Sequence, residues 1–465
     1  MKKLGVVITD GVGFRNFVMS DFIAEAKLQF DTIIIYSGLP KTCYTSFDDV
    51  TVDIRELPIF VEGKSTWFFR KWKELAHLQQ YSTFHGMNDN LVSGYPKSNS
   101  MRALLIKGLY FFTRNINSNS SVLFAEKLQF FSFSKNKITQ TYIKSLKEDR
   151  PSHVFFTHQR PPYLAPFLYA AQKLNIPVST FIFSWDNLAS KGRMLGEFDF
   201  FFFWSELMKT ELHYFYPNIK KENVKVVGTP QFEPYVMDKY KTEKEDFYLK
   251  FNLDWDKKTI CFSCADASIG QNDPQVIRAI ALAIRDNEIS MPCQLLVRTS
   301  PAESPERFAN VKKEFPEIIW NNPKWILTRE NHAESWSQRI PSEEDIKDLR
   351  SLLENVDLNV NMCSTMSLDF MLFDKPVINT VFGNPENGLY DDQRFLGYDH
   401  FKKVVDSESV TIAKNVTELI AQINEALINS ALRAAQRKSI IDLQIGKPLS
   451  RTSKRIAATL LEWND

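Results

Sequence analysis

The most constraining feature of this sequence is an alternation of short, fully apolar runs with segments of helical periodicity. In the first half the apolar runs include LGVVIT (4–9), DTIIIYSG (31–38), HVFFTHQR (153–160) and FDFFFFWSE (198–206). They lack the apolar–polar alternation of a strand with one solvated face, which indicates strands buried on both faces. Strands that alternate with helices pair in parallel through crossover connections. We therefore predict an α/β fold.

A second series of the same kind follows a charged junction. Its predicted strands lie within KKTICFSCAD (257–266), CQLLVRTSP (293–301), DLNVNM (357–362) and KPVINTVF (375–382). A chain of 465 residues is also too long for one ordinary core. We predict two doubly wound, Rossmann-like parallel-sheet domains facing a cleft. They would span residues 1–235 and 236–450, and a terminal helix (451–465) would cross back to the first domain.

Residues 65–135 interrupt the first series with aromatic and basic helical segments such as STWFFRKWKELAHL and LLIKGLYFFTRN. One interpretation is a set of ordinary amphipathic helices packed on the sheet. The other is a surface for an acceptor or for peripheral contact with a membrane, because cationic helices with Trp and Phe suit a lipid interface. The sequence leaves both open.

Composition excludes several classes of protein. The net charge of +1 argues against a global attraction to nucleic acid. The five scattered cysteines argue against a disulfide framework and for a reducing compartment. The apolar run near Met1 is too short for a signal peptide, and no segment reaches the roughly 18 apolar residues of a membrane span. We expect a cytoplasmic protein.

Candidate ligand contacts lie where the predicted strands end, since ligands bind outside the carboxyl ends of the strands in open parallel sheets. In the second domain these positions hold Ala265, Asp266, Arg298, Ser364 and Thr365. A hydroxyl pair at a helix N-terminus favours an anion. Ordinary helix capping by the same hydroxyls is the alternative.

The stretches DLNVNMCSTMSLDFMLFDKPVI (357–378), GTPQFE (228–233) and VRTSP (297–301) resemble the GT-B glycosyltransferase superfamily. The first stretch is most similar to the CDP-glycerol glycerophosphotransferase and capsule-type branches. The resemblance implies that the second domain binds a nucleotide-activated sugar. Ser364 and Thr365 would contact the diphosphate, Asp369 the ribose, and Arg298 would neutralise phosphate charge. The chain departs from the pattern at Thr299-Ser300, where relatives often carry His.

The first domain would then hold the acceptor. An inverting transfer needs a base within reach of the acceptor hydroxyl, and the candidates are Asp10, His158 and Asp186. A turn or capping role is the alternative for the two aspartates, and a packing role for His158; a retaining enzyme needs no such base. The candidate acceptor contacts are Arg15, Asn16, Arg160, Trp185 and Lys191.

We predict no bound cofactor and no catalytic metal. The resemblance to GT-B enzymes implies that cationic groups and helix ends neutralise the leaving diphosphate. The acidic stretch GLYDDQRFLGYDH (388–400) has residue types that bind metals, but we expect an exposed loop there.

The leading interpretation is a glycosyltransferase that moves a sugar from a nucleotide-activated donor to a surface-glycan or lipid-linked acceptor. The alternatives are a sugar-nucleotide epimerase of the same fold, a glycerophosphotransferase, and a non-catalytic nucleotide-sugar-binding scaffold. An epimerase would need several carboxylates that converge on the site.

Overall fold

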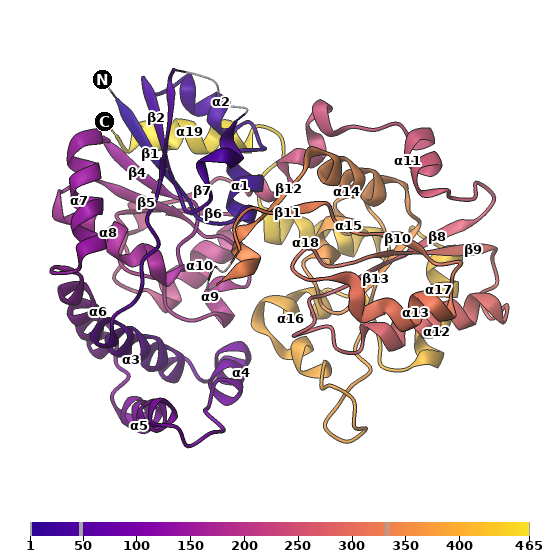
Figure 1. Cartoon of the computed structure of the whole chain (residues 1–465). Helices are drawn as coiled ribbons and strands as arrows, with labels where there is room; N and C mark the ends of the chain where they lie inside the picture. The colour runs from indigo at the N-terminus through magenta and orange to yellow at the C-terminus, as the bar shows by residue number, and fades with distance from the viewer. Residues whose placement is uncertain (1, 46–49, 331, 333, 465) are drawn as a thin grey trace. The chain divides into compact units, whose positions relative to one another are not determined.

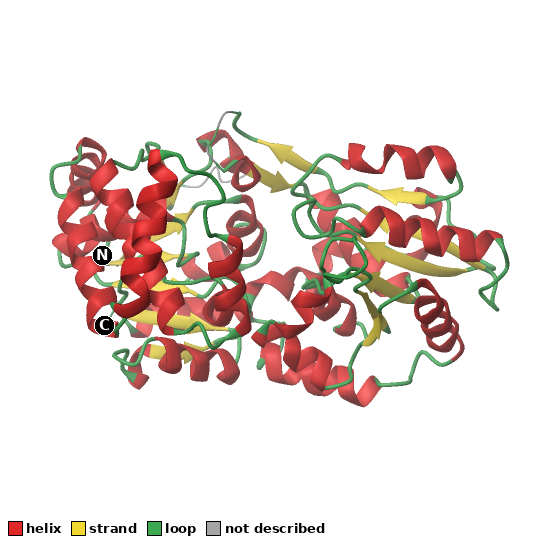
Figure 2. Cartoon of the chain, turned by 90° about the horizontal axis from the view of Figure 1, so that it is seen from below, coloured by secondary structure: helices red, strands yellow, loops and turns green. Residues whose placement is uncertain are grey.

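The computed structural model describes residues 2–45, 50–330, 332 and 334–464. The chain divides into two compact units (Figure 1). Unit 1 comprises residues 1–230 and 446–465, and unit 2 comprises residues 231–445. In each unit the strands lie among helices (Figure 2). Within the described part of the chain, no helix is long and apolar enough to cross a membrane.

Unit 1 is built on a seven-stranded, fully parallel sheet with the strand order β3-β2-β1-β4-β5-β6-β7. The strands are β1 (Lys3–Ile8), β2 (Thr32–Ser37), β3 (Val52–Glu56), β4 (His153–Phe156), β5 (Val178–Phe181), β6 (Phe200–Phe203) and β7 (Val224–Val226). The edge strand β3 was not predicted, because its buried and partly exposed residues alternate instead of forming an apolar run.

The helices of unit 1 connect these strands. They are α1 (Gly11–Phe17), α2 (Phe22–Lys27), α3 (Lys64–Gln80), α4 (His85–Ser93), α5 (Met101–Asn115), α6 (Asn119–Phe133), α7 (Lys137–Asp149), α8 (Ala165–Lys173), α9 (Asn187–Ser190), α10 (Glu206–Phe215) and the terminal α19 (Thr452–Glu462). Helices α3 to α6 form the predicted helical insertion between β3 and α7.

Phenylalanine rings form much of the unit 1 core. Phe17 makes edge-to-face contacts with Phe155 and Phe181, and Phe155 makes another with Phe202. Such pairs stabilise a core beyond the area they bury. The residue after α19, Trp463, stacks on Phe200 with 4.5 Å between ring centroids. The end of the chain is thereby packed against the sheet of unit 1.

The helical insertion is tied to the rest of unit 1 by a buried charge cluster. The ammonium group of Lys73 on α3 donates to the carbonyl oxygen of Leu195 at 2.8 Å and lies 3.5 Å from the carboxylate of Glu126 on α6. The guanidinium of Arg193 lies 3.4 Å from the same carboxylate and stacks over the ring of Tyr216. Burial lowers the pKa of Lys73, although Glu126 opposes this effect.

Unit 2 contains a six-stranded parallel sheet of order β10-β9-β8-β13-β14-β15 and a two-stranded antiparallel sheet, β11-β12. The strands are β8 (Lys258–Ser263), β9 (Cys293–Arg298), β10 (Ile319–Asn321), β11 (Trp325–Leu327), β12 (Arg339–Pro341), β13 (Leu358–Asn361), β14 (Val377–Thr380) and β15 (Thr411–Ala413). The helices are α11 (Lys244–Phe251), α12 (Asp273–Arg285), α13 (Ala309–Glu314), α14 (Glu343–Asn355), α15 (Met366–Met371), α16 (Asp399–Asp406), α17 (Val416–Ile428) and α18 (Ala434–Ile445).

Each of the two parallel sheets has one topological switch point, where successive connections leave in opposite directions. In unit 1 the chain runs from β1 outward to β3 and then returns to β4, so the switch point lies between β1 and β4. In unit 2 it lies between β8 and β13. Ligands of open α/β sheets bind at such points, outside the carboxyl ends of the strands.

Candidate functional site

Predicted donor residues lie in two loops that begin side by side at the switch point of unit 2. Ser263, the last residue of β8, is in register with Asn361, the last residue of β13. The loop after β8 carries Ala265 and Asp266, and the loop after β13 carries Ser364 and Thr365. These four residues were chosen as strand ends, and the strand order brings their two loops together.

A network of buried asparagines supports the loop after β13. The side-chain oxygen of Asn361 accepts the backbone N–H of Ser364 at 2.9 Å and an amide hydrogen of Asn379 at 2.9 Å. Asn359 donates to the Ser263 hydroxyl at 2.6 Å. All three asparagines are fully buried. The side-chain oxygen of Asn379 has no partner among the described residues, whereas the bonds made by Asn359 and Asn361 hold the end of β13 to the end of β8 and to the Ser364 turn.

Sequence reasoning missed these asparagines. A signal was present, because Asn359 and Asn361 alternate with apolar residues in a strand predicted to be buried, and asparagine is depleted in strands. Two amides on one face of such a strand indicate a polar network or a ligand.

The Ser364 hydroxyl has a capping role. It accepts the backbone N–H of Met366, the first residue of α15, at 3.2 Å. Cys363, just before it, has a φ of 46°, a left-handed conformation that a non-glycine residue adopts at a cost. The hydroxyl-bearing turn is thus held in an uncommon backbone conformation, and Asn361 supports it. The capping alternative stated for the two hydroxyls is thus met in part: Ser364 accepts the first N–H of α15, whereas Thr365, the N-cap residue, makes no side-chain capping bond. The diphosphate role of both residues stays a prediction.

Asp369 lies within α15 and is buried. Its carboxylate accepts a short hydrogen bond from the hydroxyl of Tyr235. Tyr235 itself packs near the ring of Phe373. A carboxylate that is positioned by a hydroxyl donor in this way is suited to further hydroxyl groups, and the ribose role of Asp369 stays a prediction.

The loop after β8 is held by a second carboxylate. Asp273, at the start of α12, accepts the backbone N–H of Ala265 at 3.0 Å and pairs with Arg307 at 3.2 Å. Arg307 also donates to the carbonyl oxygens of Ala265 and Gly270, at 2.6 Å and 2.7 Å. Burial raises the pKa of Asp273 to about 7, against the opposing effect of Arg307. Asp266 accepts the backbone N–H of Ser268 at 2.9 Å, which closes a turn at the loop's tip.

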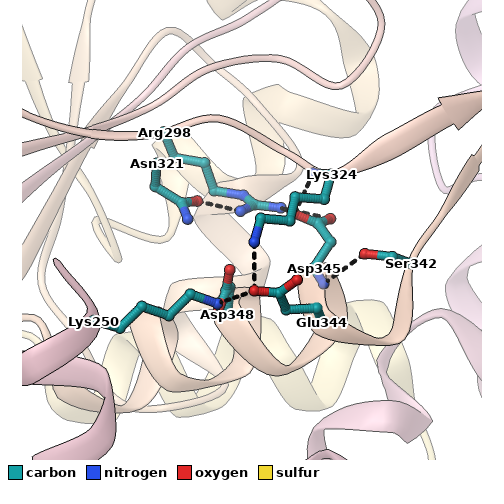
Figure 3. Close-up of polar contacts among 8 residues, drawn as sticks. All are labelled: Lys250, Arg298, Asn321, Lys324, Ser342, Glu344, Asp345 and Asp348. Atoms are coloured by element: carbon teal, nitrogen blue, oxygen red, sulfur yellow. Dashed lines mark hydrogen bonds and ion pairs between the residues drawn. The ribbon is translucent and has the colours of Figure 1, made fainter.

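Arg298 has partners within the protein instead of an open strand end (Figure 3). Its Nη2 donates to both carboxylate oxygens of Asp345, at 3.0 and 3.1 Å, and its Nη1 donates to the side-chain oxygen of Asn321. Arg298 and Asp345 are both buried. The prediction that Arg298 neutralises phosphate did not foresee this partner, which lies on α14. The charge of Arg298 is already balanced by a carboxylate.

Asp345 is the centre of a larger cluster at the start of α14 (Figure 3). It also accepts the backbone N–H of Lys324 at 3.1 Å and the indole N–H of Trp325 at 2.9 Å. On the exposed side, Glu344 pairs with Lys250 and Lys324. Hydrogen bonds from these two lysines lower the pKa of Glu344 to about 2.

In unit 1, Asp10 follows β1 at the switch point and caps α1. Its carboxylate accepts the backbone N–H of Gly13 at 2.7 Å and the hydroxyl of Thr9 at 2.9 Å. Asp10 is fully buried. The capping alternative stated for this residue is therefore realised, and its proposed role as base would require the carboxylate to leave these donors.

His158 follows β4 on the other side of the same switch point. Its ring stacks on Phe183 with 3.9 Å between centroids, and its Nδ1 accepts the backbone N–H of Arg160 at 3.1 Å. Burial, and then the charge of Arg160, lower the pKa of His158 well below its ordinary value. The ring is therefore neutral near pH 7, and because Nδ1 is the acceptor, the proton resides on Nε2. In this tautomer His158 offers a hydrogen-bond donor at Nε2, and its role as base stays a prediction.

Asp186 and Lys191 lie together after β5 and form an ion pair at 3.4 Å. The Asp186 side chain retains 18% exposure, more than Asp10 or His158. Asp186 occupies the N-cap position of α9 without making a side-chain capping bond. Trp185 is buried, so its ring has no open stacking face of the kind predicted for a sugar.

The remaining predicted acceptor contacts are Arg15 and Asn16 on α1 and Arg160 after β4. Arg15 and Arg160 are partly exposed, whereas Asn16 is buried. Neither the side-chain oxygen nor the nitrogen of Asn16 has a hydrogen-bond partner among the described residues. A buried amide without partners is rare in folded proteins and calls for an explanation.

The acidic stretch at 388–400 is less exposed than predicted. Asp392 is buried, accepts the backbone N–H of Gly383 at 2.8 Å and bonds to the amide of Asn272 at 2.7 Å. It closes a loop onto the start of α12. Within the residues that the structure describes, no group of three or more His, Cys, Asp or Glu side chains is arranged to hold a metal ion.

Known structures resemble the chain in fold. No protein-family model and no curated protein matches it. MnaA of S. aureus, solved with UDP, has a TM-score of 0.55 at 13% identity, over 100% of this chain and 97% of that one. The UDP-GlcNAc 2-epimerase of Neisseria meningitidis bound to UDP-GlcNAc has a TM-score of 0.51 at 12% identity, over 99% of this chain and 100% of that one. A glycosyltransferase of Rickettsia africae has a TM-score of 0.51 at 11% identity, over 99% of this chain and 98% of that one. With its two parallel sheets of seven and six strands, the chain has the GT-B fold, an α/β architecture of two Rossmann-like domains.

Proposed function

We propose that this chain is a glycosyltransferase that moves a sugar from a nucleotide-activated donor to a surface-glycan or lipid-linked acceptor, without a bound metal or cofactor. One observation carries the proposal: in each of the two large sheets, several of the residues chosen from the sequence lie at the topological switch point. In unit 1 these are Asp10 and His158, and in unit 2 the loops of Ala265 and Ser364. Fold alone does not determine a reaction, so the proposal depends on these positions.

In the proposed donor site, the turn at Ser364 and Thr365 contacts the diphosphate and Asp369 binds the ribose. Tyr235 is already bonded to Asp369 and orients its carboxylate for a second hydroxyl. Ala265 and Asp266 form the opposite wall, held by Asp273 and Arg307. Because the charge of Arg298 is balanced by Asp345, we assign Arg298 a positioning role at the end of β9.

In the proposed acceptor site, Asp186 is the best candidate for the base of an inverting transfer. It is the most exposed of the three candidates, and its carboxylate lies 3.4 Å from the ammonium group of Lys191. His158 would donate a hydrogen bond from Nε2–H to a substrate oxygen. Asn16 would pair its buried amide with an acceptor hydroxyl, which explains why this amide has no partner in the chain.

The epimerase and glycerophosphotransferase alternatives differ in their substrates. An epimerase would convert UDP-GlcNAc without any acceptor, and a glycerophosphotransferase would release CMP from CDP-glycerol. The carboxylate of Asp10 is bonded to a helix N-terminus, which reduces the set of carboxylates that could converge for epimerisation. Proton NMR of the protein with UDP-GlcNAc alone separates epimerisation from transfer, whereas release of CMP from CDP-glycerol in the presence of an acceptor would identify a glycerophosphotransferase.

The first test is a thermal-shift screen of the full chain against UDP, GDP, CDP, CMP, dTDP and ADP. We expect one nucleotide to raise the melting temperature, because a ligand that binds only the native state stabilises it. Thr365→Val should abolish that shift while leaving the unliganded melting temperature nearly unchanged. Thr417→Val, an isosteric change at an exposed site in the first turn of α17, is the matched control.

Two outcomes would contradict the proposal. If no nucleotide shifts the melting temperature, the donor site is refuted and the scaffold alternative loses its ligand as well. If Thr365→Val lowers the unliganded melting temperature strongly and leaves the nucleotide shift intact, Thr365 has a structural role only.

A further inference from the structure

Helix α5 in unit 1 is anchored on one side only. Its inner face packs on α3, where Leu109 joins Leu75 and Leu91 in a small apolar cluster. Phe112 meets the edge of Trp72 with 5.2 Å between ring centroids. The hydroxyl of Ser100 caps the helix at its first turn. In Figure 1, α5 lies at the margin of the helical insertion, beyond α3. The helix is therefore well formed and held in place.

The outer face of α5 is apolar as well. Met101, Leu104, Leu105 and Phe111 are 77%, 50%, 54% and 77% exposed. They are spaced at i, i+3, i+4 and i+10, which places them along one stripe of the helix. A surface helix ordinarily buries its apolar face and turns its polar face to solvent. Single exposed apolar residues need no explanation, but a continuous stripe marks an interaction surface.

The charges around this stripe have one sign. Residues 90–125 contain four cationic side chains, Lys97, Arg102, Lys107 and Arg114, and no Asp or Glu. The whole chain, by contrast, has a net charge of only +1. Arg102 lies over the ring of Trp67, and Lys107 bonds to the side chain of Asn99. These contacts hold two cations beside the apolar stripe.

This combination selects among occupants. A second copy of the chain would bring two cationic faces together, so charge repulsion opposes self-association through α5. An anionic lipid surface matches both features, since apolar side chains enter the boundary of the acyl region while the cations meet phosphate headgroups. We propose that the outer face of α5 docks this protein on anionic membranes. This docking does not depend on the nucleotide or on the donor site.

Sedimentation with lipid vesicles tests the proposal on the full chain. We expect binding to vesicles that contain phosphatidylglycerol, weaker binding to pure phosphatidylcholine, and a loss of binding as salt is raised. Leu104→Ser combined with Phe111→Ser should weaken binding about tenfold or more, because both apolar side chains leave the acyl boundary. Each of Arg102→Gln, Lys107→Gln and Arg114→Gln should weaken binding to anionic vesicles roughly fivefold.

The controls separate docking from folding and from the proposed function. Leu249→Ser removes an equally exposed apolar side chain, 76% exposed, from α11 in unit 2 and should leave vesicle binding unchanged. The α5 variants should keep the melting temperature and any nucleotide-induced shift, so failure of the donor site would be seen separately. Absence of vesicle binding by the wild type, or binding that both sets of α5 variants retain, overturns the proposal. So does a dimer, seen by light scattering, that Phe111→Ser dissociates.

Discussion

Replacing Arg298 tests whether its charge belongs to the fold or to a ligand. The side chains of Arg298 and Asp345 are 7% and 4% exposed, and Nη2 of Arg298 lies 3.0 and 3.1 Å from the two carboxylate oxygens. Arg298→Met keeps the aliphatic stem and removes the guanidinium. Asp345 would then retain only the N–H groups of Lys324 and Trp325 among these donors. Removing one partner of a buried ion pair typically costs about 3–5 kcal/mol, since the other charge stays buried.

Two further variants show whether this loss of stability comes from the unpaired buried charge. Arg298→Met combined with Asp345→Leu removes both charges and should recover most of the stability. Lys324→Met breaks the pair with Glu344, whose two side chains are 49% and 51% exposed next to the same helix, and should cost about 1 kcal/mol or less. Urea unfolding followed by circular dichroism measures each variant, with separate transitions fitted for the two units.

A small effect would refute the structural role. If Arg298→Met unfolds within about 1 kcal/mol of the wild type and also loses nucleotide binding, the guanidinium contacts phosphate as the sequence predicted. If stability falls and the remaining folded protein still binds nucleotide, Arg298 stabilises the end of β9 and does not contact the phosphate.

Three further predictions concern the loops of unit 2. Asn361→Ala should lower the free energy of unfolding by about 1–3 kcal/mol and weaken nucleotide binding, because it leaves buried donors unpaired. Unchanged nucleotide binding would show that the asparagine network does not support the donor site. Gly383→Ala would place a Cβ 1.7 Å from the carbonyl oxygen of Tyr390 and should lower the melting temperature markedly, whereas Gly108→Ala, with nothing within 4 Å of its Cβ, should raise it. Because the pKa of Asp273 is raised to about 7 in the fold, its contribution to stability is full below its ordinary pKa and is lost as pH rises through 7. Between the ordinary pKa of aspartate and pH 7, the free energy of unfolding of the wild type should therefore fall relative to that of Asp273→Asn, as measured by urea unfolding. Equal pH profiles of the two proteins would contradict the raised pKa.

Periodicity alone was enough to predict the α/β class and most strands. The run at Phe200–Phe203 has no polar face, and its last three residues are buried as expected. A strand buried on both faces is apolar throughout, because successive side chains point to opposite faces of the sheet and both faces pack against the core. The edge strand β3 alternates in exposure and lacks the mark. The end of each apolar run also marks the end of a strand. The residues after these ends were the candidate ligand contacts, and they include both loops at the switch point of unit 2.

Only the tertiary structure decided which partners these residues take. Arg298 pairs with Asp345 on α14, 47 residues later in the chain, and no local pattern links the two. Asp10, by contrast, caps its own helix, a choice that depends on the nearby N–H of Gly13. The tautomer of His158 is set by the backbone of Arg160. A side chain's periodicity depends on its neighbours in sequence, whereas its charge and hydrogen bonds depend on groups that the sheet order brings beside it.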